Sequence, residues 1–214
     1  MIEEIYKQRF SSEKTSRNKI YEILCSSYFQ QYVPHDSTVL EIAAGYCEFI
    51  NHISAKNKIA VDINPDAKQY AAANVNFYLS SSTNLHWLKN VSVDVIYVSN
   101  FFEHITKEDI VKTLKECHRV LKSSGRIMIL QPNIRYCYKE YWMFFDHITP
   151  LDDRSLAECL EVNGFKVIKN VPRFLPFTTK SKLPKYPFLI KLYLKIPLFQ
   201  KIFGKQAFIV ARKN

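Results

Sequence analysis

Glycine is scarce in this sequence: its 214 residues include only Gly45, Gly125, Gly164 and Gly204. A chain so poor in glycine keeps it where the backbone geometry demands it, so we expect each of the four to begin or end a helix or strand. Internal repeats and low-complexity segments are absent as well. With 47 % hydrophobic and 14 % aromatic residues, the composition is typical of a globular protein, and the length suits a single α/β domain.

Long apolar runs are also missing. No stretch approaches the roughly 18 uninterrupted apolar residues that a membrane-spanning helix requires. The longest candidate, 186–203, is interrupted by Lys191, Lys195, Pro197 and Lys201. The first seven residues are too acidic for the basic and then apolar pattern of a secretory signal. We therefore expect a cytoplasmic protein.

The cysteines and histidines show no pattern of disulfides or metal ligands. The five cysteines never form C-x-x-C and are scattered: Cys25, Cys47, Cys117, Cys137 and Cys159. This predicts buried, reduced thiols and argues against a disulfide framework or a zinc site. The six histidines do not cluster with cysteines or acids at ligand spacing, so the sequence predicts no metal site.

Acidic residues are missing from the last quarter of the chain. None follows Glu161, whereas twelve Lys and Arg residues do. The net charge is +10, from 30 basic and 20 acidic residues, so residues 1–161 carry −2. The whole basic excess therefore lies in the C-terminal segment.

Alternating strand and helix signals predict the fold class. Apolar and β-branched runs predict seven strands, at 38–42, 58–62, 75–79, 93–99, 126–130, 165–168 and 206–211. Helices are predicted at 46–55, from Pro65, at 110–121 behind a capping box that starts at Thr106, and after Asp152 with a stop at Gly164. This alternation indicates an α/β fold, a three-layer, Rossmann-like doubly wound sheet that is mostly parallel, with its ligand at the carboxyl ends of the strands.

Two segments fall outside this alternation. Residues 1–36 are predicted to form a helical N-terminal extension, with the helix within 6–33, and residues 37–214 the sheet-containing domain. A basic, apolar insertion at about 172–203 separates the last two strands. Within it, 186–196 can form a helix that Pro197 kinks or ends.

A loop motif and a distant acid point to the ligand. In the segment 41–47, EIAAGYC, an acid is followed at alternate positions by the small residues Ala43, Gly45 and Cys47. Small residues let the backbone approach a ligand closely, and the following helix points its N–H groups at it. Asp62 ends the second strand, and a carboxylate can accept hydrogen bonds from both hydroxyls of a ribose. NAD binding would share this acid, but a pyrophosphate needs closer backbone approach than Ala43 and Cys47 permit.

This loop and acid resemble those of class I S-adenosylmethionine-dependent methyltransferases, with two of the family's glycines replaced. Other landmarks follow in the family's order: 80–82 stands where the family places an acid against the adenine, and 99–104, SNFFEH, matches the motif that lines methionine and acceptor. The resemblance spans 38–212 and implies an antiparallel last strand and S-adenosylmethionine as cofactor. It assigns to cofactor binding the residues Glu41, Ala43, Gly45, Tyr46, Asp62, Ile63, Ser81, Ser82, Asn100 and Phe101.

The implied reaction is an in-line displacement at a methyl group on a sulfonium, catalysed by positioning. An acceptor hydroxyl would need a base with a pKa near neutral, and His104 is the first candidate. His147, at the end of the aromatic run 141–147, is the second. The aromatic run itself is equally consistent with a hydrophobic lid or with plain core.

The acceptor class stays open at this point. The stretch 172–180 resembles bacterial methyltransferases associated with surface polysaccharides, which favours O-methylation of a saccharide or a lipid-linked glycan intermediate. The basic insertion could then rest on an anionic membrane at its inner face, or simply cover the acceptor pocket. An RNA or tRNA methyltransferase is one alternative, although Asn100 is not followed by the two prolines common in base-amine methyltransferases. A non-catalytic S-adenosylmethionine-binding module is another.

Overall fold

A seven-stranded sheet in the order β3-β2-β1-β4-β5-β7-β6 forms the centre of the molecule. It is seen in a computed structural model that describes residues 14–177 and 186–214. The strands are β1 Thr38–Ile42, β2 Asn57–Asp62, β3 Val75–Leu79, β4 Val93–Ser99, β5 Leu121–Pro132, β6 Phe165–Leu175 and β7 Gln206–Lys213. β7 runs antiparallel to both of its neighbours, whereas the other pairs are parallel. The predicted fold class is confirmed.

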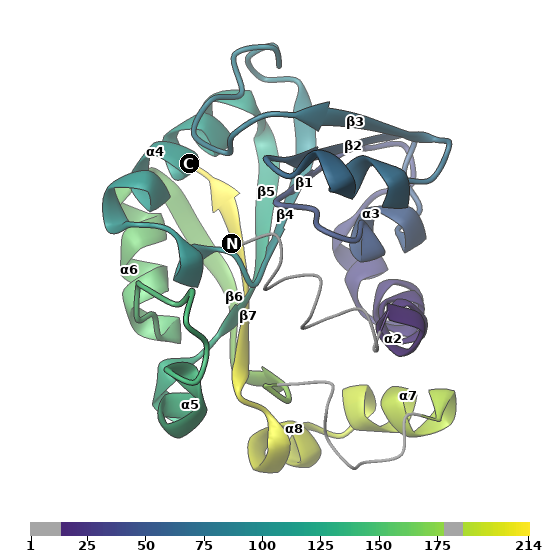
Figure 1. Cartoon of the computed structure of the whole chain (residues 1–214), viewed down its shortest axis with the longest axis vertical. Helices are drawn as coiled ribbons and strands as arrows, with labels where there is room; N and C mark the ends of the chain where they lie inside the picture. Colours follow the sequence, from purple (N-terminus) through teal and green to yellow (C-terminus); the bar gives the residue numbers. More distant parts are fainter. Residues whose placement is uncertain (1–13, 178–185) are drawn as a thin grey trace.

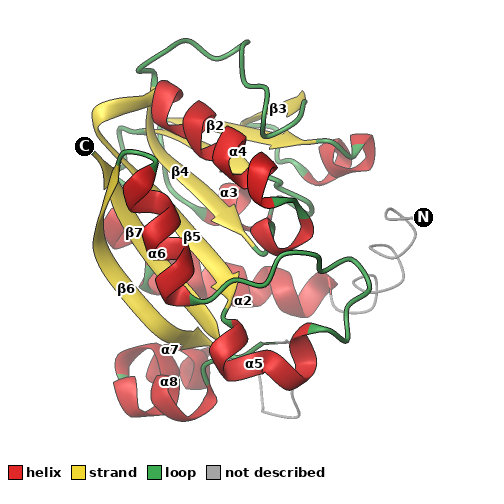
Figure 2. Ribbon diagram, turned by 90° about the vertical axis from the view of Figure 1, so that its left-hand side faces the viewer, coloured by secondary structure: helices red, strands yellow, loops and turns green. Residues whose placement is uncertain are grey.

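Helices cover both faces of this sheet, so the domain has three layers (Figures 1 and 2). The helical elements are α2 Lys14–Ser27, η2 Phe29–Tyr32, α3 Glu48–His52, η3 Pro65–Tyr70, η4 Phe102–His104, α4 Lys107–Val120, α5 Ile134–Tyr141, α6 Asp153–Val162, α7 Pro187–Lys195 and α8 Pro197–Phe203. Alternate residues of β4 reach opposite layers. Ile96 and Val98 pack with α4 and α6, whereas Val95 and Tyr97 pack with α2 and α3.

Local signals in the sequence set several boundaries correctly. Thr106 caps α4 by accepting from the backbone N–H of Asp109, as predicted. Asp152 forms a complete capping box with Ser155 at the start of α6. Gly164, just after the last turn of α6, adopts a φ of 85°, which suits a glycine stop.

Other boundaries were predicted wrongly. The helix expected over 46–55 is reduced to α3. It begins after Cys47, whose φ is 55°, and it ends at His52, because Ile53 is already extended. The helix from Pro65 is the 3₁₀ segment η3. β6 continues beyond residue 168 through Pro172, which is tolerated because β6 is an edge strand. Gly125, expected in a turn, lies within β5.

The predicted extensions are partly described. α2 and η2 form the described part of the N-terminal extension, and residues 1–13 lie outside the described residues. In the predicted insertion, 172–175 belongs to β6 and 178–185 lies outside the described residues. α7 confirms the helix predicted within 186–196, and Pro197 starts α8. Both views place α5, α7 and α8 at the same end of the sheet (Figures 1 and 2).

Candidate functional site

The loop after β1 has an unusual backbone. Ala43, Gly45 and Cys47 have φ values of 53°, 51° and 55°, so every second residue is left-handed. Glycine adopts this conformation freely, whereas for other residues it costs roughly 1–2 kcal/mol each. The glycine-type geometry of the motif is thus kept at two positions where the sequence no longer has glycine. A loop that keeps strained geometry in this way indicates that its shape is needed.

Asp62 holds this loop from the end of β2. Its Oδ2 accepts the backbone N–H of Gly45 at 2.8 Å, and its Oδ1 accepts that of Asn64 at 2.8 Å. Asn64, and not Asp62, caps η3, since its side chain accepts from Asp66. Each carboxylate oxygen keeps a second lone pair. The half-buried Asp62 can therefore fix the loop and still accept from a diol.

A pocket of about 150 Å³ opens beside Asp62. It is lined by Ala43, Val61, Asp62, Ile63, Ser80, Ser81, Ser82, Thr83, Phe101, Ile105 and Asp109. Six of the residues predicted to bind the cofactor are thus brought together around one cavity. Asp109 was missed as a lining residue, because its sequence signal was that of the α4 capping box. It supplies a carboxylate close to the serines that replace the family's acid.

Four of the predicted residues lie outside this lining: Gly45, Asn100, Glu41 and Tyr46. Glu41 is buried beneath the loop, where its Oε2 accepts the backbone N–H of Ile50 in α3 at 2.9 Å. Burial raises the pKa of the Glu41 carboxyl well above its usual range. Tyr46 packs its ring against Tyr70 of η3, with the ring centroids 4.6 Å apart. Both residues shape the loop from outside the pocket.

The N-terminal extension reaches the same loop. Arg17 of α2 forms an ion pair with Glu48 at 2.8 Å, and its guanidinium lies 5.9 Å from the centre of the Tyr46 ring. Tyr21 is hydrogen-bonded to Ser99, at the end of β4, over 2.9 Å. Sequence reasoning missed these contacts, because nothing in a lone helix indicates which strand ends it will meet.

Asn100 and Phe101 continue from β4 toward the pocket. Asn100 has a φ of 47°, and its backbone N–H donates to the carbonyl of Leu130 in β5 at 2.8 Å. This turn directs the chain so that Phe101 lines the cavity. The next residues, in η4, therefore lie directly beside this pocket.

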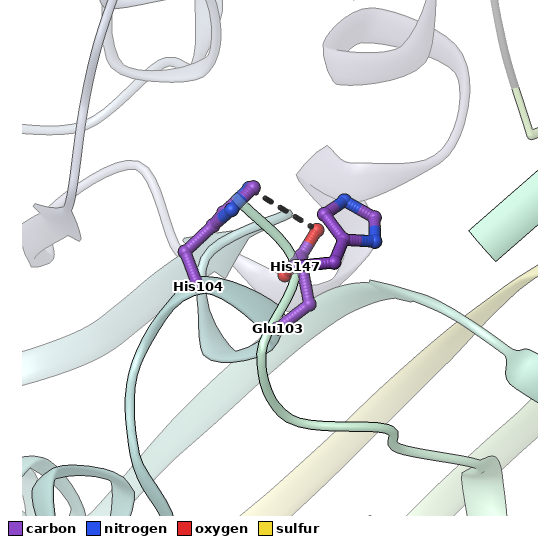
Figure 3. Close-up of side chains that lie close together, drawn as sticks. All are labelled: Glu103, His104 and His147. Atoms are coloured by element: carbon purple, nitrogen blue, oxygen red, sulfur yellow. Dashed lines mark ion pairs between the residues drawn. The ribbon is translucent and has the colours of Figure 1, made fainter. Parts of the chain in front are cut away.

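His104 and His147 meet there, although 43 positions separate them. Their ring centroids are 4.9 Å apart, and Glu103 lies between them (Figure 3). The expectation that no histidines cluster with acids is wrong. One ligand atom from each of Glu103, His104 and His147 lies within 4.8 Å of the others. The sequence could not show this, because a long-range tether makes it: the Glu103 carbonyl accepts the backbone N–H of Ile148 at 2.8 Å.

Asp146 determines which ring nitrogen of His104 carries the hydrogen. Nδ1 of His104 lies 3.0 Å from the Asp146 carbonyl oxygen and 3.3 Å from its Oδ2. A carbonyl oxygen only accepts, so Nδ1 carries the hydrogen. In the neutral ring the lone pair is then on Nε2, which faces Glu103 Oε1 at 3.7 Å. Glu103 is 1 % exposed, and burial raises the pKa of its carboxyl.

Comparison with known proteins agrees with this geometry. Residues 40–129 match the model of a family described as a methyltransferase domain. No curated protein matches the sequence significantly. Among solved structures, an S-adenosylmethionine-dependent methyltransferase from Archaeoglobus fulgidus is 24 % identical with a TM-score of 0.70, covering 96 % of this chain and 99 % of that one.

Two other solved structures share the fold at lower identity. The YcgJ protein of Bacillus subtilis is 16 % identical with a TM-score of 0.63, covering 90 % of this chain and 98 % of its own. The second is geranyl diphosphate C-methyltransferase from Streptomyces coelicolor, solved with Mg²⁺, geranyl diphosphate and S-adenosylhomocysteine. It is 12 % identical with a TM-score of 0.61, and the match covers 88 % of this chain and 77 % of that one. Residues 40–129 thus match a methyltransferase domain, and the whole chain shares the fold of solved S-adenosylmethionine-dependent methyltransferases.

Proposed function

We propose that the pocket beside Asp62 binds the adenosine part of S-adenosylmethionine. Asp62 would accept hydrogen bonds from the ribose hydroxyls, and Ser81, Ser82 and Asp109 would face the adenine. The loop 43–47 would bring its backbone against the rest of the cofactor, beside Phe101. The fit rests on the lining of the cavity and on the second lone pair of each Asp62 oxygen. When bound, the cofactor supplies a methyl group on a positively charged sulfur that a nucleophile can attack.

We further propose that the acceptor is a hydroxyl and that His104 takes its proton. The observation that carries this is the Asp146–His104 contact, which places the hydrogen on Nδ1 and leaves the Nε2 lone pair available to a substrate. The hydrogen bond goes to the backbone carbonyl of Asp146, and the Asp146 carboxylate lies 3.3 Å from the same nitrogen. A carboxylate beside an imidazole that is oriented in this way is typical of general-base catalysis. His147, packed edge-on against His104, is the second candidate for the base. As the new O–CH₃ bond forms, the S–CH₃ bond breaks and sulfur keeps the electron pair.

We propose a saccharide or lipid-linked glycan as the acceptor, because of the surface beside the site. Trp142, Met143 and Phe145 follow α5 and are 55–78 % exposed. At the same end of the sheet, α7 and α8 present exposed apolar side chains: Phe188, Leu192, Leu198, Ile202 and Phe203 (Figure 2). Exposed apolar patches on this scale usually mark interaction sites.

Charge favours an anionic membrane as the partner of this surface. Lys191, Lys195 and Lys201 are exposed on the same two helices, in a region without acidic residues. None of the helices within 14–177 and 186–214 is long and apolar enough to cross a bilayer. Contact would therefore be peripheral, with each basic residue near the lipid contributing about 1 kcal/mol.

The function can be tested by following a labelled methyl group. The protein is incubated with methyl-labelled S-adenosylmethionine and separate lipid-linked, soluble-glycan and RNA fractions of a bacterial extract. We expect label in a glycan fraction, and a rate about 10²–10⁴-fold lower in His104→Ala with unchanged cofactor affinity. His86→Ala, an exposed histidine far from the cluster, is the matched control. Label only in RNA would contradict the acceptor class, and an unimpaired His104→Ala would contradict the base.

A further inference from the structure

The cluster at η4 has the composition of a metal site. Glu103 offers a carboxylate oxygen, and His104 and His147 each offer a ring nitrogen, all within 4.8 Å of one another. Two imidazoles and one carboxylate with a free fourth position form the ligand set of catalytic zinc sites. Imidazole suits first-row transition ions, whereas Mg²⁺ prefers oxygen ligands. The three donor atoms therefore favour a transition-metal ion over Mg²⁺, and they also define where the ion would lie.

Distances within the cluster suit such an ion. Ligand atoms about 2.0–2.1 Å from a tetrahedral zinc ion lie about 3.4 Å from each other. Nε2 of His104 is 3.7 Å from Oε1 of Glu103, so a shift of a few tenths of an ångström would bring this pair to ligand spacing. All three ligand atoms lie within 4.8 Å of one another, and the widest pair would have to approach further. Glu103 and His147 are buried, whereas His104 is half-buried. The fourth position is therefore accessible from the side of His104.

The surroundings of the cluster hold the three ligands in place. Oε2 of Glu103 accepts a hydrogen bond from Nε2 of Gln131 at 2.9 Å, which leaves Oε1 to face the histidines. Asp146 accepts from Nδ1 of His104 and so points Nε2 into the cluster. Metal-bound histidines characteristically donate their other ring nitrogen to a carboxylate or a carbonyl. This outer shell is already present in the chain.

A tether fixes the segment that carries His147. The Glu103 carbonyl accepts from the N–H groups of Ile148, at 2.8 Å, and Thr149, at 3.1 Å, while the Thr149 hydroxyl donates to the Ile105 carbonyl at 2.6 Å. Residues from two distant parts of the chain are thereby held in one arrangement. A site fixed in advance binds an ion without the cost of ordering its ligands.

From this geometry we infer that Glu103, His104 and His147 bind one divalent transition-metal ion, of which Zn²⁺ is the type, with its fourth position open to the acceptor. The inference rests on the methyl transfer to a hydroxyl in the proposed function, and it gives the ion the role that His104 has there as the base. With the ion bound, the Nε2 lone pair of His104 is a ligand and no longer a base. The acceptor hydroxyl in the fourth position would then lose its proton to solvent more readily, because a cation lowers the pKa of a bound hydroxyl.

Metal binding itself is the first test. The full-length protein is stripped with a chelator and titrated with Zn²⁺ and, separately, with Co²⁺, whose absorption spectrum reports its coordination. We expect one ion per chain, a higher unfolding temperature with the ion bound, and no competition by Mg²⁺. His104→Ala and Glu103→Gln should weaken binding by roughly a hundredfold or more, and Asp146→Asn by about tenfold. His86→Ala should bind like wild type.

The result that overturns the site is a folded wild-type protein that binds neither Zn²⁺ nor Co²⁺, or that binds them equally well in the cluster variants. Glu103 is buried, so Glu103→Gln could fail to fold for reasons unrelated to the metal. The unfolding temperature of each metal-free variant shows whether that variant folds. If Glu103→Gln does not fold, His104→Ala, a change at a half-buried residue, provides the test. Methyl transfer by the stripped protein separates the two proposals. Full activity without the ion would overturn its role at the acceptor and keep His104 as base. Tight binding without transfer to any acceptor fraction would overturn the proposed function and leave the site.

Discussion

Gly45 and Asp62 are joined by a hydrogen bond of 2.8 Å, from the backbone N–H of the loop after β1 to Oδ2 at the end of β2. The two strands are direct neighbours in the sheet. One carboxylate thus orders the loop after β1 and also lines the pocket in which we propose that the ribose binds. The shape of the loop and the affinity for the cofactor are therefore expected to change together.

Replacing Asp62 should weaken cofactor binding. Asp62→Ala would lose the charge-assisted hydrogen bonds to the ribose, so we expect roughly ten- to hundredfold lower affinity, about 1.5–3 kcal/mol, for S-adenosylmethionine and S-adenosylhomocysteine. Asp62→Asn keeps one accepting oxygen, so its affinity for both ligands should lie between that of the wild type and that of Asp62→Ala. Isothermal titration calorimetry measures both ligands. A natively folded Asp62→Ala with wild-type affinity would show that Asp62 only orders the loop.

The strained loop predicts a substitution that should increase the stability of the fold. Ala43→Gly places glycine where φ is positive, so it should stabilise the fold, by about 1 kcal/mol. At Cys47, whose φ is also positive, glycine would remove a fully buried side chain, and the cavity would offset the gain. Ala44→Gly is the matched control, since Ala44 has no positive φ and should lose stability when it becomes glycine. Urea denaturation gives the free energy of unfolding of each variant, and equal losses in Ala43→Gly and Ala44→Gly would contradict strain at Ala43.

Glu41 should make the fold less stable as the pH rises. Its unfolded carboxyl ionises near the ordinary pKa of about 4.3, whereas burial raises the pKa in the folded state. The folded state then binds more protons above pH 4.3, and stability falls as pH increases through that window. Glu41→Gln still accepts from Ile50 but carries no charge, so it should be more stable at neutral pH and less dependent on pH.

The check for Glu41 is chemical denaturation at several pH values between 4 and 8. Glu22→Gln, an exposed glutamate on α2, is the control and should leave the pH dependence as in wild type. If Glu41→Gln follows the wild-type curve, the buried carboxyl does not control this slope. The affinity of Glu41→Gln for S-adenosylmethionine should stay close to that of the wild type, because Glu41 does not line the pocket.

The basic helices should bind anionic membranes. We expect the protein to co-sediment with vesicles containing anionic lipid at low salt and to be released by high salt, because salt screens charges outside the membrane core. Lys191→Glu with Lys195→Glu should abolish this binding. Lys89→Glu with Lys115→Glu changes the net charge equally at exposed sites away from α7 and should bind as wild type does. Absence of wild-type binding at low salt would leave α7 and α8 as a cover for the acceptor pocket.

Local signals in the sequence were sufficient for much of the fold. β4 was predicted at its observed limits, because a mostly apolar, β-branched run between polar turns has few other solutions. Thr106 and Asp152 marked helix starts, because capping is a contact between near neighbours. The short α3 was not foreseen, because the left-handed conformation of Cys47 is imposed by the loop and not by its own side chain.

In the candidate site, too, the residues that follow strand ends could be predicted, whereas contacts between distant segments could not. Asp62 and the serines could be found from their order after successive strands, since a parallel sheet brings strand ends together. The contact of His104 with His147 and that of Arg17 with Glu48 could not, because each depends on how distant segments pack. Glu103 itself stood in the motif SNFFEH, but only the fold shows that its carbonyl holds the segment with His147.

The place where α7 and α8 enter the chain has an evolutionary consequence. Leu175, in β6, pairs with Gln206 in β7, and the N–H of Lys205 donates to the Leu175 carbonyl at 2.7 Å. β6 therefore leaves the sheet and β7 enters it at neighbouring positions. Doubling the length of a connection between such ends costs only about 0.6 kcal/mol in closure entropy. Insertions between the two strands should therefore leave their pairing unchanged.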